Sequence, residues 1–306
     1  MSGMNRRGWL RHAGLGALAS LGALHAGGSA GAIPPIGRTR PSHLKLSIAA
    51  YSYRDYLKSK PPKMDMFDFV SLAADMGLDA VEPTSYYFPE DLDSDYLHRL
   101  KLHAFTLGLD ISGTAVGNNF CLPPGPERDK QLEDVRTWID RAAELDAPVI
   151  RIFAGRVAKG STEEQAVAWA IEGFKASLEY AARKGVVLAL ENHGGITESP
   201  EQLLKLVKAV DSPYFGVNLD TGNFHGADPY ADLAKLAPYA MNVQVKTEIK
   251  PAGAAKKQEA DLARFIAILR EARYSGYVVL EYEAAADPMT SIPKHIATLR
   301  RLISNS

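Results

Sequence analysis

The chain has 306 residues, and its 35 Lys and Arg against 36 Asp and Glu give a formal net charge of −1. This balance excludes the strongly basic surface expected of a nucleic-acid-binding domain. A single cysteine, Cys121, excludes an intramolecular disulfide, so the fold must be stabilised by its core. The length suits one barrel-type domain of about 250 residues or two smaller domains.

The first 32 residues have the pattern of an export signal. The segment "NRRGWLR" (residues 5–11) is a twin-arginine-like cluster, residues 13–26 are small and apolar, and residues 30–32 form an A-x-A cleavage site. A membrane anchor is the alternative, but a span needs about 20 apolar residues and this stretch is shorter. We therefore predict a twin-arginine-type signal peptide over 1–32, an N-terminal tail over 33–43, and a periplasmic protein without a stable membrane span.

From residue 44 onward, short runs of β-branched and aliphatic residues alternate with longer amphipathic stretches. We predict eight strands, at residues 46–50, 80–83, 110–115, 149–153, 186–191, 215–220, 242–246 and 277–281. Helical stretches lie between them, one of which ends at Gly185. Eight such repeats predict a single α/β domain over 44–306, a closed (β/α)8 TIM barrel. An open doubly wound sheet is the alternative, but no glycine-rich phosphate loop follows the first strand. Residues 250–258 are predicted to form a mobile loop after strand seven.

Four neighbouring strands end in polar side chains. Glu191 shares parity with the inward positions Val187 and Ala189, and Asp220 ends strand six on its inward face. Gln244 belongs to a polar row inside strand seven, and Glu281 ends strand eight. Catalytic groups of TIM barrels lie where the strands end, so we expect these four residues to share one rim.

Crowded carboxylates repel one another unless a cation holds them. Oxygen ligands favour Mg²⁺ or Mn²⁺, with Zn²⁺ as an alternative that more often takes His or Cys. Each residue taken singly has an ordinary reading as a solvated carboxylate or amide at a loop. The coincidence of all four at matching positions favours a metal centre. Such a centre suits proton transfer next to a carbonyl, because the ion acidifies the adjacent C–H and a carboxylate removes the proton.

Five segments of the chain carry a resemblance to a known family. "AAYSYRDYL" (49–57), "LALENHGG" (188–195), "GVNLDTGNF" (216–224), "NVQVK" (242–246) and "VVLEYE" (278–283) resemble the sugar phosphate isomerase/epimerase family of xylose isomerase-like barrels. The resemblance implies a divalent ion held by Glu191, Asp220, Gln244 and Glu281. It also implies that Glu191 and Glu281 are catalytic and exchange protons with carbons beside a substrate carbonyl.

The chain departs from that family at two positions. Many epimerases of the family carry His where this chain has Gln244, while hydroxypyruvate isomerase-like members carry Gln. Members often place His three residues after the aspartate, where this chain has Asn223. His225 comes two residues later, so a substrate-binding role for His225 departs from the usual spacing of the family.

Further residues near the predicted rim are candidates for substrate binding. Lys246 and His193 could steady an anionic intermediate, and their ordinary readings are a surface lysine and a turn. Glu82 and Arg151 could bind hydroxyls, with an interior salt bridge as the alternative. Tyr51 could form an apolar wall with nearby aromatic residues, or belong to the core or a lid.

These residues predict an exported, metal-dependent isomerase or epimerase acting on a small carbohydrate. Export makes phosphorylated sugars poor candidates. A lyase or hydratase of 3-keto-glycosides is the main alternative, because the same proton abstraction would expel a glycosidic leaving group. A non-catalytic sugar-binding barrel does not require two proton-transfer carboxylates. Endonuclease IV-like barrels use more metal-ligand histidines, and the acidic balance opposes binding to a phosphate backbone. The sequence leaves an oligomer open.

Overall fold

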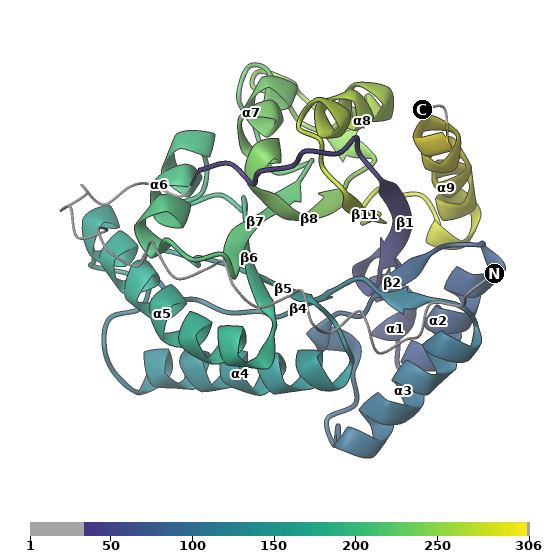
Figure 1. The fold of residues 1–306 in the computed structure, drawn as a ribbon, viewed down its shortest axis with the longest axis horizontal. Coiled ribbons are helices and arrows are strands. Elements are labelled where there is room, and N and C mark those ends of the chain that lie inside the picture. The colour runs from purple at the N-terminus through teal and green to yellow at the C-terminus, as the bar shows by residue number, and fades with distance from the viewer. Residues whose placement is uncertain (1–33, 305–306) are drawn as a thin grey trace, which may run out of the picture. The chain divides into compact units, whose positions relative to one another are not determined.

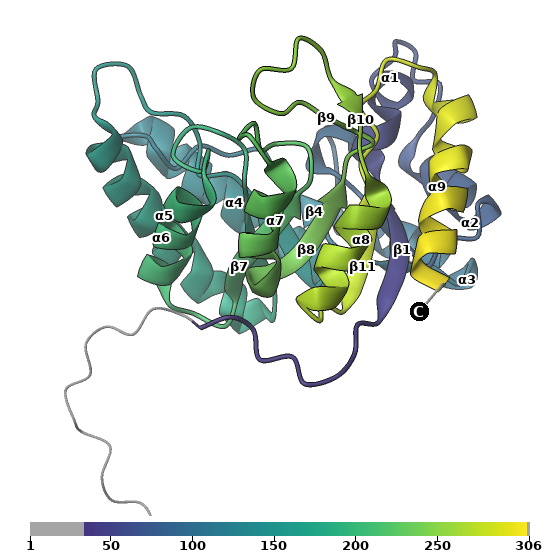
Figure 2. The same cartoon turned by 90° about the horizontal axis from the view of Figure 1, so that it is seen from above.

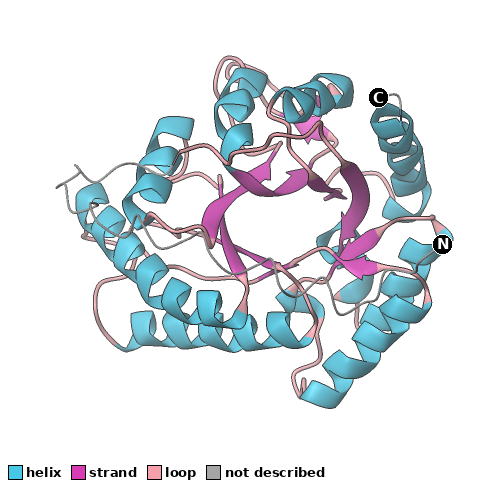
Figure 3. Ribbon diagram, in the orientation of Figure 1, coloured by secondary structure: helices cyan, strands magenta, loops and turns pink. Residues whose placement is uncertain are grey.

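A computed structural model describes residues 34–304 of the chain. The predicted signal peptide (1–32) and Ile33 lie outside the described residues. Parallel strands form one sheet in the order β3-β2-β1-β11-β8-β7-β6-β5-β4 and appear as a ring in Figures 1 and 3. Their bounds are β1 Leu44–Ala49, β2 Ala80–Glu82, β3 Asp110–Ile111, β4 Thr114–Ala115, β5 Val149–Ile152, β6 Val187–Glu191, β7 Phe215–Asp220, β8 Ala240–Val245 and β11 Gly276–Leu280.

The ring closes because β3 and β4 are two halves of the single strand predicted at 110–115. β3 pairs with β2, β4 pairs with β5, and a bridge joins Thr84 beyond β2 to Ala115. The interruption has a local cause at Ser112 and Gly113. Ser112 Oγ lies 2.7 Å from Ser47 Oγ, and a Cβ on Gly113 would lie 2.8 Å from Val149 Cγ1. The described residues thus form the predicted TIM barrel. It has eight strand positions, one of which is shared by the two short strands β3 and β4.

Helices form the outer layer of the barrel (Figure 1). Their bounds are α1 Arg54–Leu57, α2 Met66–Asp75, α3 Ser94–Thr106, α4 Pro126–Glu144, α5 Glu163–Lys184, α6 Pro200–Val210, α7 Pro229–Leu236, α8 Leu262–Glu271 and α9 Pro288–Ser304. Sequence signals set their ends. Capping boxes begin α5 at Thr162 and α6 at Ser199, and α5 ends at Gly185, whose φ of 74° is accessible to glycine at little cost.

The N-terminal segment at 34–43 crosses the end of the barrel where the strands begin (Figure 2). The Ile36 amide donates a hydrogen bond to Pro238 O at 3.0 Å. The Arg38 guanidinium donates to the carbonyls of Pro238 and Ala240 and lies 5.3 Å from the Tyr274 ring centroid. The predicted tail is therefore attached to the bottom of the barrel, opposite the strand ends that carry the polar residues.

The predicted loop after strand seven is flanked by a short antiparallel hairpin of β9 Glu248–Ile249 and β10 Gln258–Glu259. None of the described helices is both apolar and long enough to cross a bilayer.

Candidate active site

Three buried carboxylates converge at the C-terminal ends of neighbouring strands. Glu191 ends β6, Asp220 ends β7, and Glu281 follows β11 directly, with exposed fractions of 4%, 0% and 5%. The register places Glu191 beside Asn218 and Asp220 beside Gln244. Three acidic groups thus lie together in a nearly water-free part of the barrel, where an uncompensated charge is costly.

Asn192 explains why a second polar residue follows Glu191. Its side-chain amide donates to Asp220 O and its carbonyl accepts from Asp220 N, both at 2.9 Å. The backbone at the end of β7 is therefore clamped to the end of β6. Gly222 N donates to Asp220 Oδ1 at 2.7 Å, which leaves Asp220 Oδ2 without a hydrogen bond.

The Lys246 ammonium lies among the carboxylates. Lys246 Nζ is 2.7 Å from Glu281 Oε2, 2.7 Å from Glu283 Oε1 and 3.3 Å from Asp220 Oδ2. The residue is only 6% exposed. Its aliphatic chain passes against Gly222, where a Cβ would lie 2.6 Å from Lys246 Cγ. The lysine predicted to lie beside the rim is therefore the central cation of the cluster, held by a glycine-lined passage.

Glu191 has its own partners. Arg151 Nε lies 2.9 Å from Glu191 Oε2, and Asn223 Nδ2 donates to Glu191 Oε1 at 2.9 Å. Arg151 is fixed in turn by Val116 O and by the Tyr86 hydroxyl. Arg151 thus forms an interior salt bridge with Glu191 on the neighbouring strand and not one that spans the barrel, and Asn223 contacts the same carboxylate.

Gln244 is engaged inside the barrel. Its carbonyl accepts from Asn218 Nδ2 and its amide donates to Glu82 Oε1, both at 2.6 Å. Asn242 Nδ2 donates to Glu82 Oε2 at 2.7 Å and to Asn218 Oδ1 at 2.9 Å. Glu82 is completely buried within this network. The carboxylate of Glu82 therefore has two amide partners and no ion pair among the described residues, and its role in substrate binding stays a prediction.

Burial controls the protonation of these groups. Burial raises the pKa of Asp220 to about 7, against the attraction of Lys246, and raises that of Glu82 to about 7. Burial also raises the pKa of Glu191 well above its usual value, although the Arg151 charge opposes this. For Lys246, burial alone would lower the pKa, but attraction by Asp220, Glu281 and Glu283 outweighs it and the pKa is raised.

The carboxylate cluster fits a cation in its charge but not as a preformed metal site. Among residues 34–304, no three His, Cys, Asp or Glu side chains are arranged to hold an ion. Asp220 Oδ2 has an ion pair with Lys246 at 3.3 Å but no hydrogen bond, and several carboxylates share this one ammonium, so the excess of negative charge suits a divalent ion. The oxygens of Glu191, Asp220 and Glu281 would be the donors, in exchange for some of their present contacts with Arg151, Asn223 and Lys246. Gln244 would have to release Asn218 before its oxygen could join them.

The remaining candidates divide between the mouth and a more distant loop. Lys246 Nζ lies 5.8 Å from the Tyr51 ring centroid, so Tyr51 lies beside the cluster. His193 packs against Phe153 at the mouth, with 4.5 Å between ring centroids, and burial lowers its pKa. His225 is exposed and contacts Lys250 O at 3.1 Å, away from the carboxylates. Sequence reasoning missed Glu283 and Asn223, although "LEYE" gives Glu283 the same parity as Glu281.

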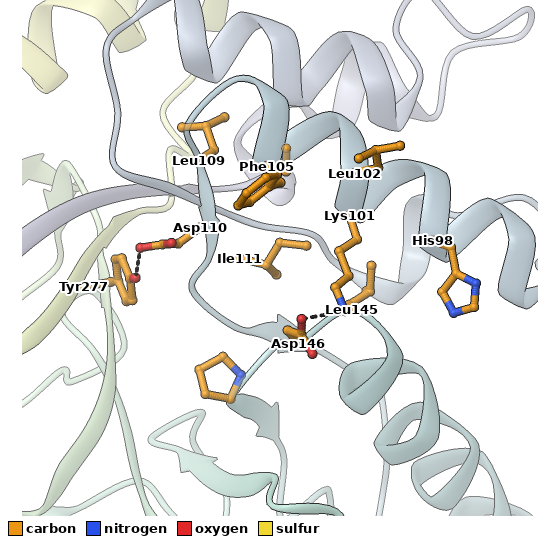
Figure 4. Close-up of a pocket in the computed structure, with 12 residues that line it drawn as sticks. His98, Lys101, Leu102, Phe105, Leu109, Asp110, Ile111, Leu145, Asp146 and Tyr277 are labelled. Atoms are coloured by element: carbon orange, nitrogen blue, oxygen red, sulfur yellow. Dashed lines mark hydrogen bonds and ion pairs between the residues drawn. The ribbon is translucent and has the colours of Figure 1, made fainter.

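Cavities flank the cluster on two sides of the mouth. One of about 480 Å³ is lined by His193, Phe153 and Arg156 among others, and a second of about 550 Å³ includes Glu283 and Tyr282. A third cavity of about 780 Å³ lies around α3 and the beginnings of the strands, where Figure 4 draws Phe105, Ile111 and Tyr277. It lies at the opposite end of the barrel from the carboxylate cluster and shares no residue with it.

Acidic groups gathered at the C-terminal ends of the strands are typical of TIM-barrel enzymes. The family comparison identifies the same kind of barrel. The xylose isomerase-like TIM barrel family matches residues 70–302. The chain belongs to this family. No curated protein matches the sequence.

Solved structures share the fold at low sequence identity. D-psicose 3-epimerase with D-fructose is 16% identical with a TM-score of 0.68, covering 85% of this chain and 97% of its own. The 3-keto-D-glucoside 4-epimerase YcjR from E. coli is 16% identical with a TM-score of 0.64, covering 85% and 99%. The IolI protein, solved with a zinc atom, is 17% identical with a TM-score of 0.67, covering 84% and 96%. Likeness at this identity establishes the common barrel.

Proposed function

We propose that the chain is an exported, divalent-metal-dependent isomerase or epimerase that transfers a proton on a carbon next to a carbonyl of a carbohydrate. One observation carries the proposal. Two buried glutamates, Glu191 at the end of β6 and Glu281 after β11, lie close enough for their charges to interact, and each is paired with its own cation. Two such groups can serve two positions of a substrate, one removing a proton and the other returning it.

Residues of the chain would divide the work. Arg151 favours the ionised form of Glu191, and Asn223 orients its other oxygen, so Glu191 is prepared to accept a proton. Glu281 receives a hydrogen bond from Lys246, and this ammonium supplies a donor for an anionic intermediate. The Tyr51 ring lies beside this ammonium and could form an apolar wall for the substrate.

Glu191, Asp220 and Glu281 would hold the divalent ion, with Gln244 as a fourth ligand once its carbonyl leaves Asn218. We favour Mn²⁺ or Mg²⁺ because the donors are oxygens, with Zn²⁺ as the alternative. When bound, the ion supplies polarisation of the carbonyl and its neighbouring hydroxyl. The zinc atom of the IolI structure supports metal binding in a barrel of this fold.

The expected export makes free sugars or oxidised glycosides better substrates than phosphorylated sugars. A 3-keto-glycoside lyase or hydratase is the second candidate, and the two cavities beside the cluster favour it. They offer room for a leaving group as well as the reacting ring. YcjR, which shares the barrel, is named as an epimerase of a 3-keto-glucoside, and this supports keto-glycosides as the class of substrate.

Deuterium exchange separates these functions. The metal-loaded protein is incubated in D2O with pooled ketoses and 3-keto-glycosides and followed by NMR. Exchange into the sugar without cleavage supports the isomerase or epimerase, and release of the aglycone supports the lyase. Absence of both, with sugar binding retained, contradicts the proposal and favours a binding protein.

A further inference from the structure

We infer that Lys246 is a built-in cation that exchanges with a divalent ion at the carboxylate cluster, and that Glu283 receives the ammonium when the ion binds. The inference rests on the metal centre of the proposed function. It adds a role for each of two residues: Lys246 competes with the ion, and Glu283 holds the ammonium once the ion has displaced it.

The Lys246 ammonium and the proposed ion share ligands. Two of the three carboxylates that contact Lys246 Nζ, Asp220 and Glu281, are proposed ligands of the ion. An ammonium and a divalent ion cannot both lie against the same oxygens without strong repulsion in a buried site. Binding of the ion must therefore move Lys246 away.

Residues around Lys246 fix the position of its side chain. The side chain is almost fully buried and runs over Gly222, where a Cβ would lie 2.6 Å from Lys246 Cγ and 2.9 Å from its Cβ. The Lys246 backbone amide donates to Thr221 Oγ1 at 2.8 Å, which fixes the start of the side chain. The cluster thus has its own counter-ion, so part of its negative charge is compensated before any metal arrives.

Glu283 offers the Lys246 ammonium a position outside the proposed ligands. Glu283 Oε1 lies 2.7 Å from Lys246 Nζ, yet Glu283 is not among the proposed ligands. Its side chain is 31% exposed, against 7% for that of Glu281, and it lines the cavity at the mouth. Lys246 can keep this partner while its ammonium leaves Asp220 and Glu281, and it then faces the entering substrate.

A double-mutant cycle tests the exchange by direct binding of Mn²⁺, measured by calorimetry and by electron paramagnetic resonance. Lys246→Met removes the competing cation, so its dissociation constant for Mn²⁺ should fall about tenfold or more. Glu283→Gln should weaken Mn²⁺ binding about tenfold where Lys246 is present, because the ammonium loses its second partner. In the Lys246→Met background the same change should alter binding by less than about threefold.

Gly222→Ala keeps every charge but displaces the lysine, so it also should bind Mn²⁺ more tightly than the parent. Lys250→Met is the matched control, because Lys250 is an exposed lysine on the same side of the barrel and makes no ion pair within the described residues. Its Mn²⁺ affinity should change by less than about twofold. Thermal unfolding with and without Mn²⁺ verifies that each variant is folded.

Each outcome decides the inference. Tighter Mn²⁺ binding in both Lys246→Met and Gly222→Ala than in the parent supports exchange, even where the parent binds weakly. Equal affinities for the parent, Lys246→Met and Gly222→Ala overturn it, as does an equal effect of Glu283→Gln in both backgrounds. Absence of Mn²⁺ binding in all folded variants overturns both the inference and the metal dependence. Proton transfer itself is read separately from deuterium exchange, so a failure of exchange between cations is distinguishable from a failure of the proposed reaction.

Discussion

Arg151 Nε lies 2.9 Å from Glu191 Oε2 inside the barrel, and both side chains are buried. Burial raises the pKa of Glu191, and the Arg151 charge is the strongest influence opposing that rise. A proton acceptor in this position depends on its arginine, because only the ionised carboxylate can take a proton from the substrate.

Arg151→Met should therefore shift the acid limb of the kcat/KM profile to higher pH. Loss of the cation raises the pKa of Glu191 further, so a smaller fraction is ionised at neutral pH and activity is regained only as the pH increases. A shift of about one pH unit or more is expected from the loss of an adjacent opposite charge. Arg128→Met is the control, since Arg128 pairs with Glu172 on the outer helices. An unshifted acid limb in Arg151→Met would contradict this role.

Asp220→Ala should abolish binding of the divalent ion. Asp220 is fully buried, its Oδ2 has no hydrogen bond, and it lies between the ends of β6 and β8 in the sheet. Elemental analysis and Mn²⁺ titration of the purified variant measure the loss. Asp110→Ala, at the other end of the barrel, should retain the parental metal content. A full equivalent of metal in folded Asp220→Ala would mean that the ion binds elsewhere.

The sequence predicts the barrel and the convergence of acidic residues because both follow from periodicity. Strand alternation places Glu191 and Asp220 on inward faces, and parallel strands bring their ends to one rim. The split of the third strand at Gly113 was not predictable in this way. It depends on the approach of Val149 from β5, a contact between distant segments.

The same limit applies to side-chain direction. Gln244 and Lys246 share parity, yet Gln244 bonds to Glu82 inside the barrel while Lys246 reaches the carboxylates. The orientation of Gln244 is decided by Glu82, which comes from β2, far away in sequence. Parity gives the face of a strand, and partners contributed by other strands determine which atoms meet. The metal-ligand role of Gln244 accordingly stays a prediction.

Glu82→Gln should remove a pH-dependent loss of stability. The Glu82 pKa is raised from 4.5 to about 7 in the folded chain, so the folded state binds more protons than the unfolded state between these values. The free energy of unfolding of the parent therefore falls as pH rises through this window and remains lower above it. The shift corresponds to roughly 3 kcal/mol.

Urea unfolding at pH 4.5 to 8 checks this. The difference in unfolding free energy between Glu82→Gln and the parent should move in favour of the variant as pH rises, whatever constant cost the amide imposes on Asn242 and Gln244. The exposed residue Glu172, changed to Gln, serves as the control and should give a profile parallel to the parent. A parallel profile for Glu82→Gln would contradict the raised pKa.

Replacement of Arg6 and Arg7 by lysine should leave the precursor in the cytoplasm. The pair precedes a weakly hydrophobic segment, which is typical of signals read by an exporter of folded proteins. Such a route would allow metal loading before export. Fractionation of cells expressing the double variant and the parent measures the effect, with a single Arg11→Lys change as the control. Normal export of the double variant would contradict the prediction.

Glu191→Gln and Glu281→Gln should each lose turnover by roughly 10²- to 10⁴-fold, the usual contribution of a positioned acid or base. Glutamine preserves the size of each side chain and keeps an oxygen for a cation but cannot carry the proton. Gln244→Ala is the contrasting variant, because an amide has no titratable proton, and its milder defect should be partly restored by excess metal. With a substrate that epimerises, each Glu→Gln variant should retain deuterium wash-in at the step that the surviving glutamate serves. Complete two-sided exchange in both variants, with turnover near that of the parent, would show that these glutamates only hold a cation and that His193 or Lys246 moves the proton.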